Sequence, residues 1–186
     1  MKLIGLCGKA GSGKTTAAAY LEMKGFERKP FADPLKRMLH AVGVPEENLW
    51  GDRKEEKLEM LCGKSAREAM QLLGTEWGRN LIGKDLWVNL WCESVRGLPR
   101  VVVDDVRFTS EAAAIVNMGG VIIQMERPGH LPTIHTTHSS ESGIASGLVT
   151  YKVVNQRGIE QLTARLDQII AGVFGITEDE IVELMG

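Results

Sequence analysis

The sequence has little of three things that would assign it to a whole class of proteins: cysteine, long apolar runs and net charge. Its three cysteines, Cys7, Cys62 and Cys92, are odd in number and widely spaced, which is typical of reduced thiols and argues against a disulfide frame or a zinc site. No apolar stretch approaches the roughly eighteen residues of a membrane span, and the start lacks the pattern of a signal peptide. We therefore expect a cytoplasmic protein, in the host cytoplasm if the chain is viral, with no membrane partner and a mature chain that begins at Met1.

Positive and negative charges almost balance. Lys and Arg number 22 and Asp and Glu 24, which gives a formal net charge of -2. No overall basic field favours nucleic acid as a partner, so any bound anion must be met by local basic groups. The 186 residues are enough for one well-filled globular domain, and we expect a single domain over 1–186.

Short β-branched or apolar runs alternate with helical stretches along most of the chain. The expected strands are 2–7, 26–31, 100–106, 119–126 and 150–155, and the expected helices are 14–24, 33–42, 111–118, 159–174 and a capping helix over 177–186. Because right-handed crossovers place helices on both faces of a parallel sheet, this alternation predicts a three-layer α/β domain. Two segments differ: 55–96 reads as a long helical region without a clear strand, and 127–147 reads as a mobile loop.

The strongest motif follows the first expected strand. Residues 8–15 read GKAGSGKT and fit G-x-x-x-x-G-K-[ST] in full, between a strand and a helix. The glycines let backbone N–H groups surround phosphate oxygens, and the helix N-terminus adds its dipole. Lys14 would reach the β- and γ-phosphates, and the Thr15 hydroxyl would bind Mg²⁺. The motif predicts an ATP-type site formed by Ala10, Gly11, Ser12, Gly13, Lys14, Thr15 and Thr16.

Acidic and basic residues follow the expected strand at 100–103. By strand position alone, either Asp104 or Asp105 could serve the metal, or one of them could cap the helix that begins near Thr109. Arg107 is suited to clamp a phosphate because its guanidinium meets phosphoryl oxygens in a bidentate fork. A structural pair with Glu111, four residues on, is the alternative for this arginine.

A possible acceptor pocket lies in the segment 65–83, SAREAMQLLGTEWGRNLIG, which reads as one helix. Its apolar positions at helical spacing are Ala66, Ala69, Met70, Leu73, Trp77 and Leu81. On another side Arg67, Gln71 and Thr75 are four residues apart, with Arg79 one turn further. Arginine suits a phosphate and glutamine a base edge, but an ordinary solvated polar face stays an open interpretation.

A small kinase fits the remaining features better than other nucleotide-binding classes do. A GTPase would carry an N/T-K-x-D motif, which is absent, and residues 155–158 (NQRG) do not substitute for it. A kinase needs an acceptor pocket and a lid that excludes water, because phosphoryl transfer in an open site would become hydrolysis. The chain offers candidates for both.

Histidines and tryptophans have plainer interpretations. The histidines at 130, 135 and 138 have no cysteine or acidic partner at zinc-ligand spacing, so we expect them to form loop hydrogen bonds. The tryptophans at 50, 87 and 91 are expected to pack in the interior, since buried aromatic area is a common use.

Several segments together resemble the bacteriophage-type deoxynucleoside monophosphate kinases. They are FADPLK at 31–36, LWG at 49–51, SAREAMQLLGTEWGR at 65–79, DLWV at 85–88, DVRFTSEA at 105–112 and HSSE at 138–141, and they follow the phosphate loop in family order. The resemblance implies a P-loop NTPase fold with a five-stranded parallel sheet in the order 2-3-1-4-5, a helical acceptor-binding region over about 33–97 and a lid over about 127–147. It also implies transfer of the γ-phosphoryl group of ATP to a deoxynucleoside monophosphate, with Mg²⁺.

The resemblance further implies roles for individual residues. Asp105 rather than Asp104 would serve the metal together with Thr15, while Lys14, Arg107 and Arg127 would be catalytic. The acceptor would be bound by Asp33, Lys36, Arg67, Gln71, Trp77, Arg79 and Arg107, with Glu141 ordering the lid. The partner is then a small molecule, and the chain is a monomer or a homodimer.

Two other functions share part of this pattern. Phosphomevalonate kinases of the animal type have a phosphate loop, a PLK segment, a strand-ending D-x-R and a later SE, although the stretch QLLGTEWGR favours a nucleotide acceptor. A non-catalytic nucleotide sensor would keep the phosphate loop without needing the acceptor residues. ADP formation with a panel of acceptors would separate the three.

Overall fold

The computed structural model describes residues 1–128, 144–156 and 158–175. It divides into two compact units, one made of Met1–Pro30 and Val95–Gly186 and the other of Phe31–Ser94. Glu141, the three expected loop histidines, most of the expected lid and the expected tail helix lie outside the described residues. Within the described ranges, no helix has the length and apolar character that a membrane span requires.

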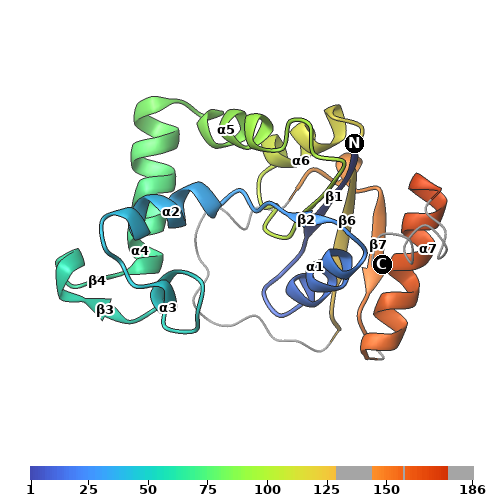
Figure 1. The fold of residues 1–186 in the computed structure, drawn as a ribbon, viewed down its shortest axis with the longest axis horizontal. Helices are drawn as coiled ribbons and strands as arrows, with labels where there is room; N and C mark the ends of the chain where they lie inside the picture. The colour runs from blue at the N-terminus through green and yellow to red at the C-terminus, as the bar shows by residue number, and fades with distance from the viewer. Residues whose placement is uncertain (129–143, 157, 176–186) are drawn as a thin grey trace. The chain divides into compact units, whose positions relative to one another are not determined.

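The first unit contains a five-stranded sheet (Figure 1). Its strands are β1 (Lys2–Cys7), β2 (Glu27–Arg28), β5 (Arg100–Val103), β6 (Val121–Glu126) and β7 (Tyr151–Val154). They lie in the order β2-β5-β1-β6-β7, and every pairing is parallel. The labels β3 and β4 belong to a separate hairpin, so the order counted within this sheet is 2-3-1-4-5, as the resemblance implied.

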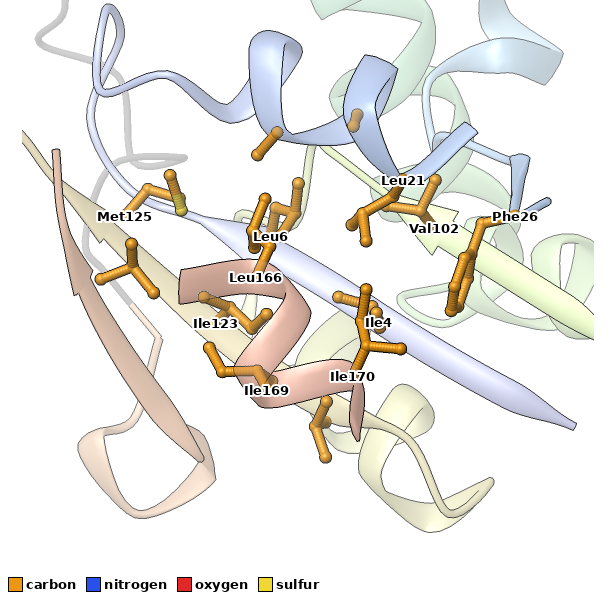
Figure 2. Packing of buried hydrophobic residues seen from close by; sticks show 14 of the residues in the cluster. Ile4, Leu6, Leu21, Phe26, Val102, Ile123, Met125, Leu166, Ile169 and Ile170 are labelled. Carbon is orange, nitrogen blue, oxygen red and sulfur yellow. The ribbon is translucent and has the colours of Figure 1, made fainter. Parts of the chain in front are cut away.

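Helices cover both faces of this sheet. The helices α1 (Lys14–Met23) and α7 (Ile159–Phe174) contact one another and share an apolar cluster with one face of the sheet. Figure 2 shows Ile4, Leu6 and Ile123 of the sheet packed with Leu21 of α1 and with Leu166, Ile169 and Ile170 of α7. Each such buried side chain contributes about 1.5–3 kcal/mol.

The helix α6 (Thr109–Asn117) covers the opposite face. Its Ile115 and the neighbouring Ile122 of β6 come so close to β1 that a Cβ on Gly5 would lie 2.8 and 2.7 Å from their Cδ1 atoms. The predicted three-layer α/β arrangement is therefore confirmed in the first unit. A 3-10 turn (Ser146–Leu148) precedes β7.

The second unit is mostly helical. Its elements are α2 (Asp33–Ala41), α3 (Glu46–Leu49), β3 (Lys57–Leu58), the 3-10 turn Glu59–Leu61, β4 (Lys64–Ser65), α4 (Ala66–Gln71), the π-helix Leu72–Ile82 and α5 (Leu86–Ser94). A small core of Leu39, Val44, Leu49 and Ala66 holds α2, α3 and α4 together. The strands β3 and β4 pair antiparallel, so the expectation of no strand over 55–96 was wrong.

The segment 65–83 is not one regular α-helix. A capping box starts α4: the Ser65 hydroxyl accepts from the Glu68 backbone N–H at 3.2 Å, and the Glu68 carboxylate accepts from the Ser65 N–H at 2.7 Å. After Gln71 the backbone becomes a π-helix, in which hydrogen bonds span five residues instead of four. An i, i+4 stripe therefore drifts out of line, and Trp77 and Leu81 are 39% and 76% exposed. Trp77 nevertheless packs against Trp87, with ring centroids 6.0 Å apart, so the packing prediction was wrong for Leu81.

The tryptophans divide in a similar way. Trp87 and Trp91 are buried, as predicted, and Trp91 packs on Phe31 with ring centroids 4.6 Å apart. Trp87 packs against the π-helix. Its indole N–H donates to the Gly74 carbonyl at 2.7 Å, and its ring occupies the space beside Gly78, which has no side chain. Trp50 is 43% exposed, so the packing prediction was wrong there.

Candidate active site

The carboxyl ends of the parallel strands bring most of the predicted phosphate-side residues to one edge of the sheet. Gly5 of β1 is in register with Val103 of β5 and Ile122 of β6, and Glu126 of β6 is in register with Val154 of β7. The segments that follow these strands therefore meet at the same edge. They carry the phosphate loop, the pair Asp104 and Asp105, Arg127 and Asn155. Ligands of open α/β sheets bind at this edge.

The phosphate loop is shaped by glycines that no other residue could replace without strain. Gly8 has φ +131°, and a Cβ there would lie 2.2 Å from the backbone oxygen of Met125. Gly13 has φ +101°, and a Cβ there would lie 2.5 Å from the Asn155 amide nitrogen. The same amide group of Asn155 donates to the Ser12 carbonyl at 3.3 Å. The loop is thus held closely between β6 and the end of β7.

Lys14 lies inside this loop. Its ammonium donates to the carbonyls of Gly8 at 2.7 Å and Lys9 at 2.8 Å. Burial, and next the nearby positive charge of Arg107, lower the pKa of Lys14, while Asp104 and Asp105 act in the opposite direction. A cation that is partly desolvated beside a second cation is an environment that favours a bound anion.

Ser12 adds a second sign of an anion site. The residue is only 3% exposed, and its hydroxyl has no hydrogen-bond partner among the described residues. Buried polar groups are almost always satisfied by protein, water or ligand. The Ser12 hydroxyl therefore fits a site completed by an oxygen-rich ligand such as a phosphate.

The two aspartates after β5 have different surroundings. The Asp104 carboxylate accepts from the Arg28 guanidinium, and its side chain is only 10% exposed. This ion pair raises the pKa of Arg28. Asp105 is partly buried and belongs to the group of charges that acts on Lys14. Asp104 thus forms an ion pair with β2, and the charge of Asp105 also acts on Arg28.

Arg107 lies on the turn between β5 and α6. Glu111 is buried, and its carboxylate accepts from the backbone N–H groups of Arg107 at 2.8 Å and Phe108 at 3.0 Å. Glu111 thus binds the backbone of Arg107, and these hydrogen bonds fix the turn that carries the arginine. The N-cap of α6 is Phe108, so neither aspartate caps that helix. The Arg107 side chain itself is exposed, and its charge acts on Lys14.

A pocket of about 210 Å³ adjoins the helix that follows the phosphate loop. It is lined by Thr16, Arg127, Asn155, Gln156, Gly158, Ile159 and Leu162. Arg127 therefore lies near Thr16, on the α1 and α7 side of the sheet edge. Apolar Leu162 and Ile159 with a few polar groups are a usual lining for a planar organic ligand.

Two predicted acceptor residues lie on α2 of the second unit. The Asp33 carboxylate accepts from Arg37 at 2.7 Å, one turn along the helix. The Lys36 ammonium lies 5.9 Å from the ring centroid of the exposed Trp50, a cation–π distance. Charge and an aromatic surface are therefore side by side near the start of this unit.

The other predicted acceptor residues lie on α4 and the π-helix. Arg67 donates to Glu55 at 2.9 Å, Gln71 is the last residue of α4, and Trp77 and Arg79 belong to the π-helix. Leu35 of α2 packs on Gly74, where a Cβ would lie 3.3 Å from its Cδ1 atom. The two predicted acceptor segments are thus adjacent in the second unit. A π-helix is rare and frequent at functional sites.

No group of three or more histidine, cysteine, aspartate or glutamate side chains capable of holding a metal ion occurs in the described part of the chain. At the sheet edge, Thr15 offers a hydroxyl oxygen and Asp105 a carboxylate, and Mg²⁺ takes oxygen ligands of this type.

Sequence reasoning missed three residues at this edge: Asn155, Gln156 and Arg28. Arg28 is the last residue of β2, and Asn155 and Gln156 are the first two residues after β7. Their positions after strands that run parallel were the available signal, because all such positions meet at one edge. The residues were overlooked because they belong to no recognisable motif.

Comparison with known proteins agrees with these features. A family model described as deoxynucleotide monophosphate kinase matches residues 52–166. A protein of Acanthamoeba polyphaga mimivirus named as a deoxynucleotide monophosphate kinase is 35% identical over 185 residues, which cover 89% of this chain and 94% of that protein. The deoxynucleoside-5'-monophosphate kinase of Escherichia phage T5 is 32% identical over 117 residues, which cover 59% of this chain and 46% of that enzyme.

A solved structure shares the fold. The crystal structure of TT1252 from Thermus thermophilus has a TM-score of 0.51 and 19% sequence identity, and the match covers 93% of this chain and 98% of that one. At this identity the likeness concerns the fold alone.

Proposed function

The chain belongs to the deoxynucleotide monophosphate kinase family, and we propose that it transfers the γ-phosphoryl group of ATP to a deoxynucleoside monophosphate, giving the diphosphate and ADP. The observation that carries this proposal is the phosphate loop. Its glycines have positive φ, its Lys14 ammonium lies among the loop carbonyls, and its buried Ser12 hydroxyl has no partner among the described residues. These are the properties of a built site for phosphate oxygens.

We assign the triphosphate of ATP to Ala10, Gly11, Ser12, Gly13, Lys14, Thr15 and Thr16. Backbone N–H groups at the start of α1 would donate to the phosphate oxygens, and Lys14 would leave the carbonyls of Gly8 and Lys9 for a stronger, charged acceptor. The adenine would occupy the pocket beside Thr16, where Arg127 contributes a cation and Leu162 an apolar surface.

Mg²⁺ would be held by the Thr15 hydroxyl and the Asp105 carboxylate. When bound, the ion neutralises charge on the β- and γ-phosphate oxygens. Both protein groups lie at the sheet edge that carries the loop, and neither is a residue on which the fold depends for its core. The same edge supplies Arg107, whose turn is fixed by buried Glu111.

The acceptor side is assigned to the second unit, the region of about 33–97. Asp33, Lys36, Arg67, Gln71, Trp77 and Arg79 would bind the base, sugar and phosphate of the deoxynucleotide, and the family resemblance assigns Arg107 and Glu141 to the acceptor as well. Their support is the family membership together with the packing of α2 on the π-helix at Leu35 and Gly74. In this proposal the chain works as one kinase domain with a lid over about 127–147.

The chemistry asked of the side chains is positioning and charge neutralisation. The acceptor phosphate is already an anion at neutral pH, so no strong general base is needed. Lys14, Arg107 and Arg127 would hold the phosphoryl oxygens in line and stabilise the charge that develops as the group moves. A small-molecule partner, action in the cytoplasm and a monomeric or dimeric state remain predictions, as does the lack of a nucleic-acid or membrane partner.

ADP release in the presence of a panel of possible acceptors tests this function. The panel contains deoxynucleoside monophosphates, ribonucleoside monophosphates and mevalonate 5-phosphate, each with ATP and Mg²⁺. Stimulation by at least one deoxynucleoside monophosphate is expected. Stimulation by mevalonate 5-phosphate alone would point to a different kinase, and slow ADP release independent of every acceptor would point to a nucleotide sensor. Lys152→Ala, at an exposed position within β7, is a matched control for Lys14→Ala.

A further inference from the structure

Arg28 stands at the end of the shortest strand of the sheet. β2 consists of two residues, and Arg28 is in register with Val102 of β5. The next residue, Lys29, donates its backbone N–H to the Val102 carbonyl at 2.9 Å. This pairing directs the Arg28 side chain to the segment that follows β5, where its guanidinium donates to Asp104.

The ion pair between Arg28 and Asp104 is partly enclosed. The Asp104 side chain is 10% exposed and that of Arg28 is 30% exposed. For comparison, Asp167, the partner of Lys24 at 3.2 Å, is 35% exposed. A carboxylate oxygen of Glu22 in α1 lies 3.8 Å from the Nη1 atom of Arg28. Enclosure strengthens a charge-assisted hydrogen bond and makes the loss of one partner costly.

The surroundings make the state of Asp104 matter for the phosphate loop. Asp104 and Asp105 are neighbours in the chain, and the charges of both act on Lys14. A carboxylate that lost Arg28 would be a second acidic group beside the lysine that must meet the triphosphate. It would repel the phosphates and compete with them for Lys14.

We propose that Arg28 is a positioning residue, which holds Asp104 in an ion pair with β2 so that Asp105 is the carboxylate that serves the metal of bound ATP. This inference rests on the proposed function. It adds a residue outside the phosphate loop and outside the strand-ending D-x-R, and it explains how two adjacent aspartates acquire different roles. Arg28 does not contact the nucleotide itself; it acts through Asp104.

Binding of a non-hydrolysable ATP analogue, measured by calorimetry with and without Mg²⁺, tests the inference independently of turnover. Arg28→Met removes the positive charge and is expected to weaken binding about tenfold, the scale of one added unpaired charge near a partly buried site. Asp104→Asn in the same chain removes the repelling carboxylate and is expected to restore affinity to within about twofold. Lys24→Met, which breaks the pair with Asp167 between α1 and α7, is the control and is expected to leave binding unchanged.

Asp104→Asn alone provides an arm that does not require Arg28→Met to fold. With Asp105 intact, Mg²⁺ is expected to strengthen analogue binding in this variant as it does in the wild type. Loss of the Mg²⁺ effect would identify Asp104 as the metal carboxylate and overturn the inference. Wild-type affinity in folded Arg28→Met, or a double variant as weak as the single one, would equally overturn it by leaving Arg28 a purely structural role.

The inference and the proposed function fail in different ways. A wild-type chain that does not bind the analogue overturns both. A wild-type chain that binds it and forms ADP with a deoxynucleotide, while the Arg28 variants give one of the contrary results, overturns the inference alone.

Discussion

Replacing Gly13 with alanine should damage the phosphate loop by two separable effects. The residue has φ +101°, a conformation that side chains other than glycine rarely adopt, and its added Cβ would lie 2.5 Å from the Asn155 amide nitrogen. The first effect belongs to the backbone and stays whatever surrounds it. The second belongs to the contact with one side chain, which can be removed.

The magnitudes follow from these two effects. A left-handed backbone with a Cβ costs about 1–2 kcal/mol, and forcing an extra methyl group into an occupied space costs about 1–3 kcal/mol. Gly13→Ala should therefore lower the free energy of unfolding by about 2–5 kcal/mol. Adding Asn155→Ala should relieve the second part only, so the cost of the alanine falls to about 1–2 kcal/mol in that background.

Two other glycines bracket this prediction. Gly119 has φ +80° with nothing within 4 Å, so Gly119→Ala should show the backbone cost alone. A Cβ added at Gly8 would lie 2.2 Å from the Met125 backbone oxygen, a contact that no side-chain truncation relieves. Gly8→Ala should therefore lower the free energy of unfolding at least as much as Gly13→Ala does.

Urea denaturation of the variants, followed by circular dichroism, measures these free energies. ATP-analogue binding by the folded fraction should weaken in Gly13→Ala and recover in part with Asn155→Ala. Two results would show that the loop is not held against Asn155. One is a Gly13→Ala variant as stable as the wild type. The other is a loss in free energy of unfolding on Gly13→Ala that is the same with and without Asn155→Ala.

Three further predictions concern the charged residues. Lys14→Ala should reduce transfer by at least about a hundredfold, the usual scale for a lost transition-state contact, without a change in circular dichroism; near-normal turnover by the folded variant would contradict its role. Arg67→Ala and Arg79→Ala should chiefly raise the KM for the acceptor, and steady-state kinetics that showed a change only in the KM for ATP would contradict the acceptor assignment. Lys57 and the Ser65 cap lower the pKa of Glu68 from 4.5 to about 2, so its contribution to stability is complete above about pH 4.5 and is lost as the pH falls towards 2. The melting temperature of Glu68→Gln should therefore fall less steeply than that of the wild type over this interval, and parallel curves would show that the capping interaction is absent.

The parts of the fold that were predicted are those in which a local pattern and the long-range arrangement agree. The motif at residues 8–15 requires a strand before it and a helix after it, and β1 and α1 supply both. The short apolar runs of β5 and β6 are buried on both faces, as a parallel sheet between helices demands. In these segments the sequence pattern is compatible with one local structure only.

The parts that were not predicted depend on contacts that no local pattern encodes. The strands β3 and β4 have two residues each, too few for an alternating pattern. The sequence of the π-helix has the apolar spacing expected of an α-helix. The indole N–H of Trp87, which belongs to the next helix, donates to the Gly74 carbonyl in this segment. Arg28 likewise shows its partner, Asp104, only after β2 and β5 have paired. Tertiary contacts decide each of these cases.

Movement of a phosphoryl group from ATP to a deoxynucleotide distinguishes a kinase from a nucleotide sensor. The most direct measurement follows ³²P from the γ-phosphate of ATP in the presence of Mg²⁺ and a deoxynucleoside monophosphate, with the products separated by chromatography. Label is expected in the β-phosphate of a deoxynucleoside diphosphate, and no such product is expected with Lys14→Ala. Label that appears only as inorganic phosphate, whichever deoxynucleotide is supplied, would contradict transfer to a deoxynucleotide.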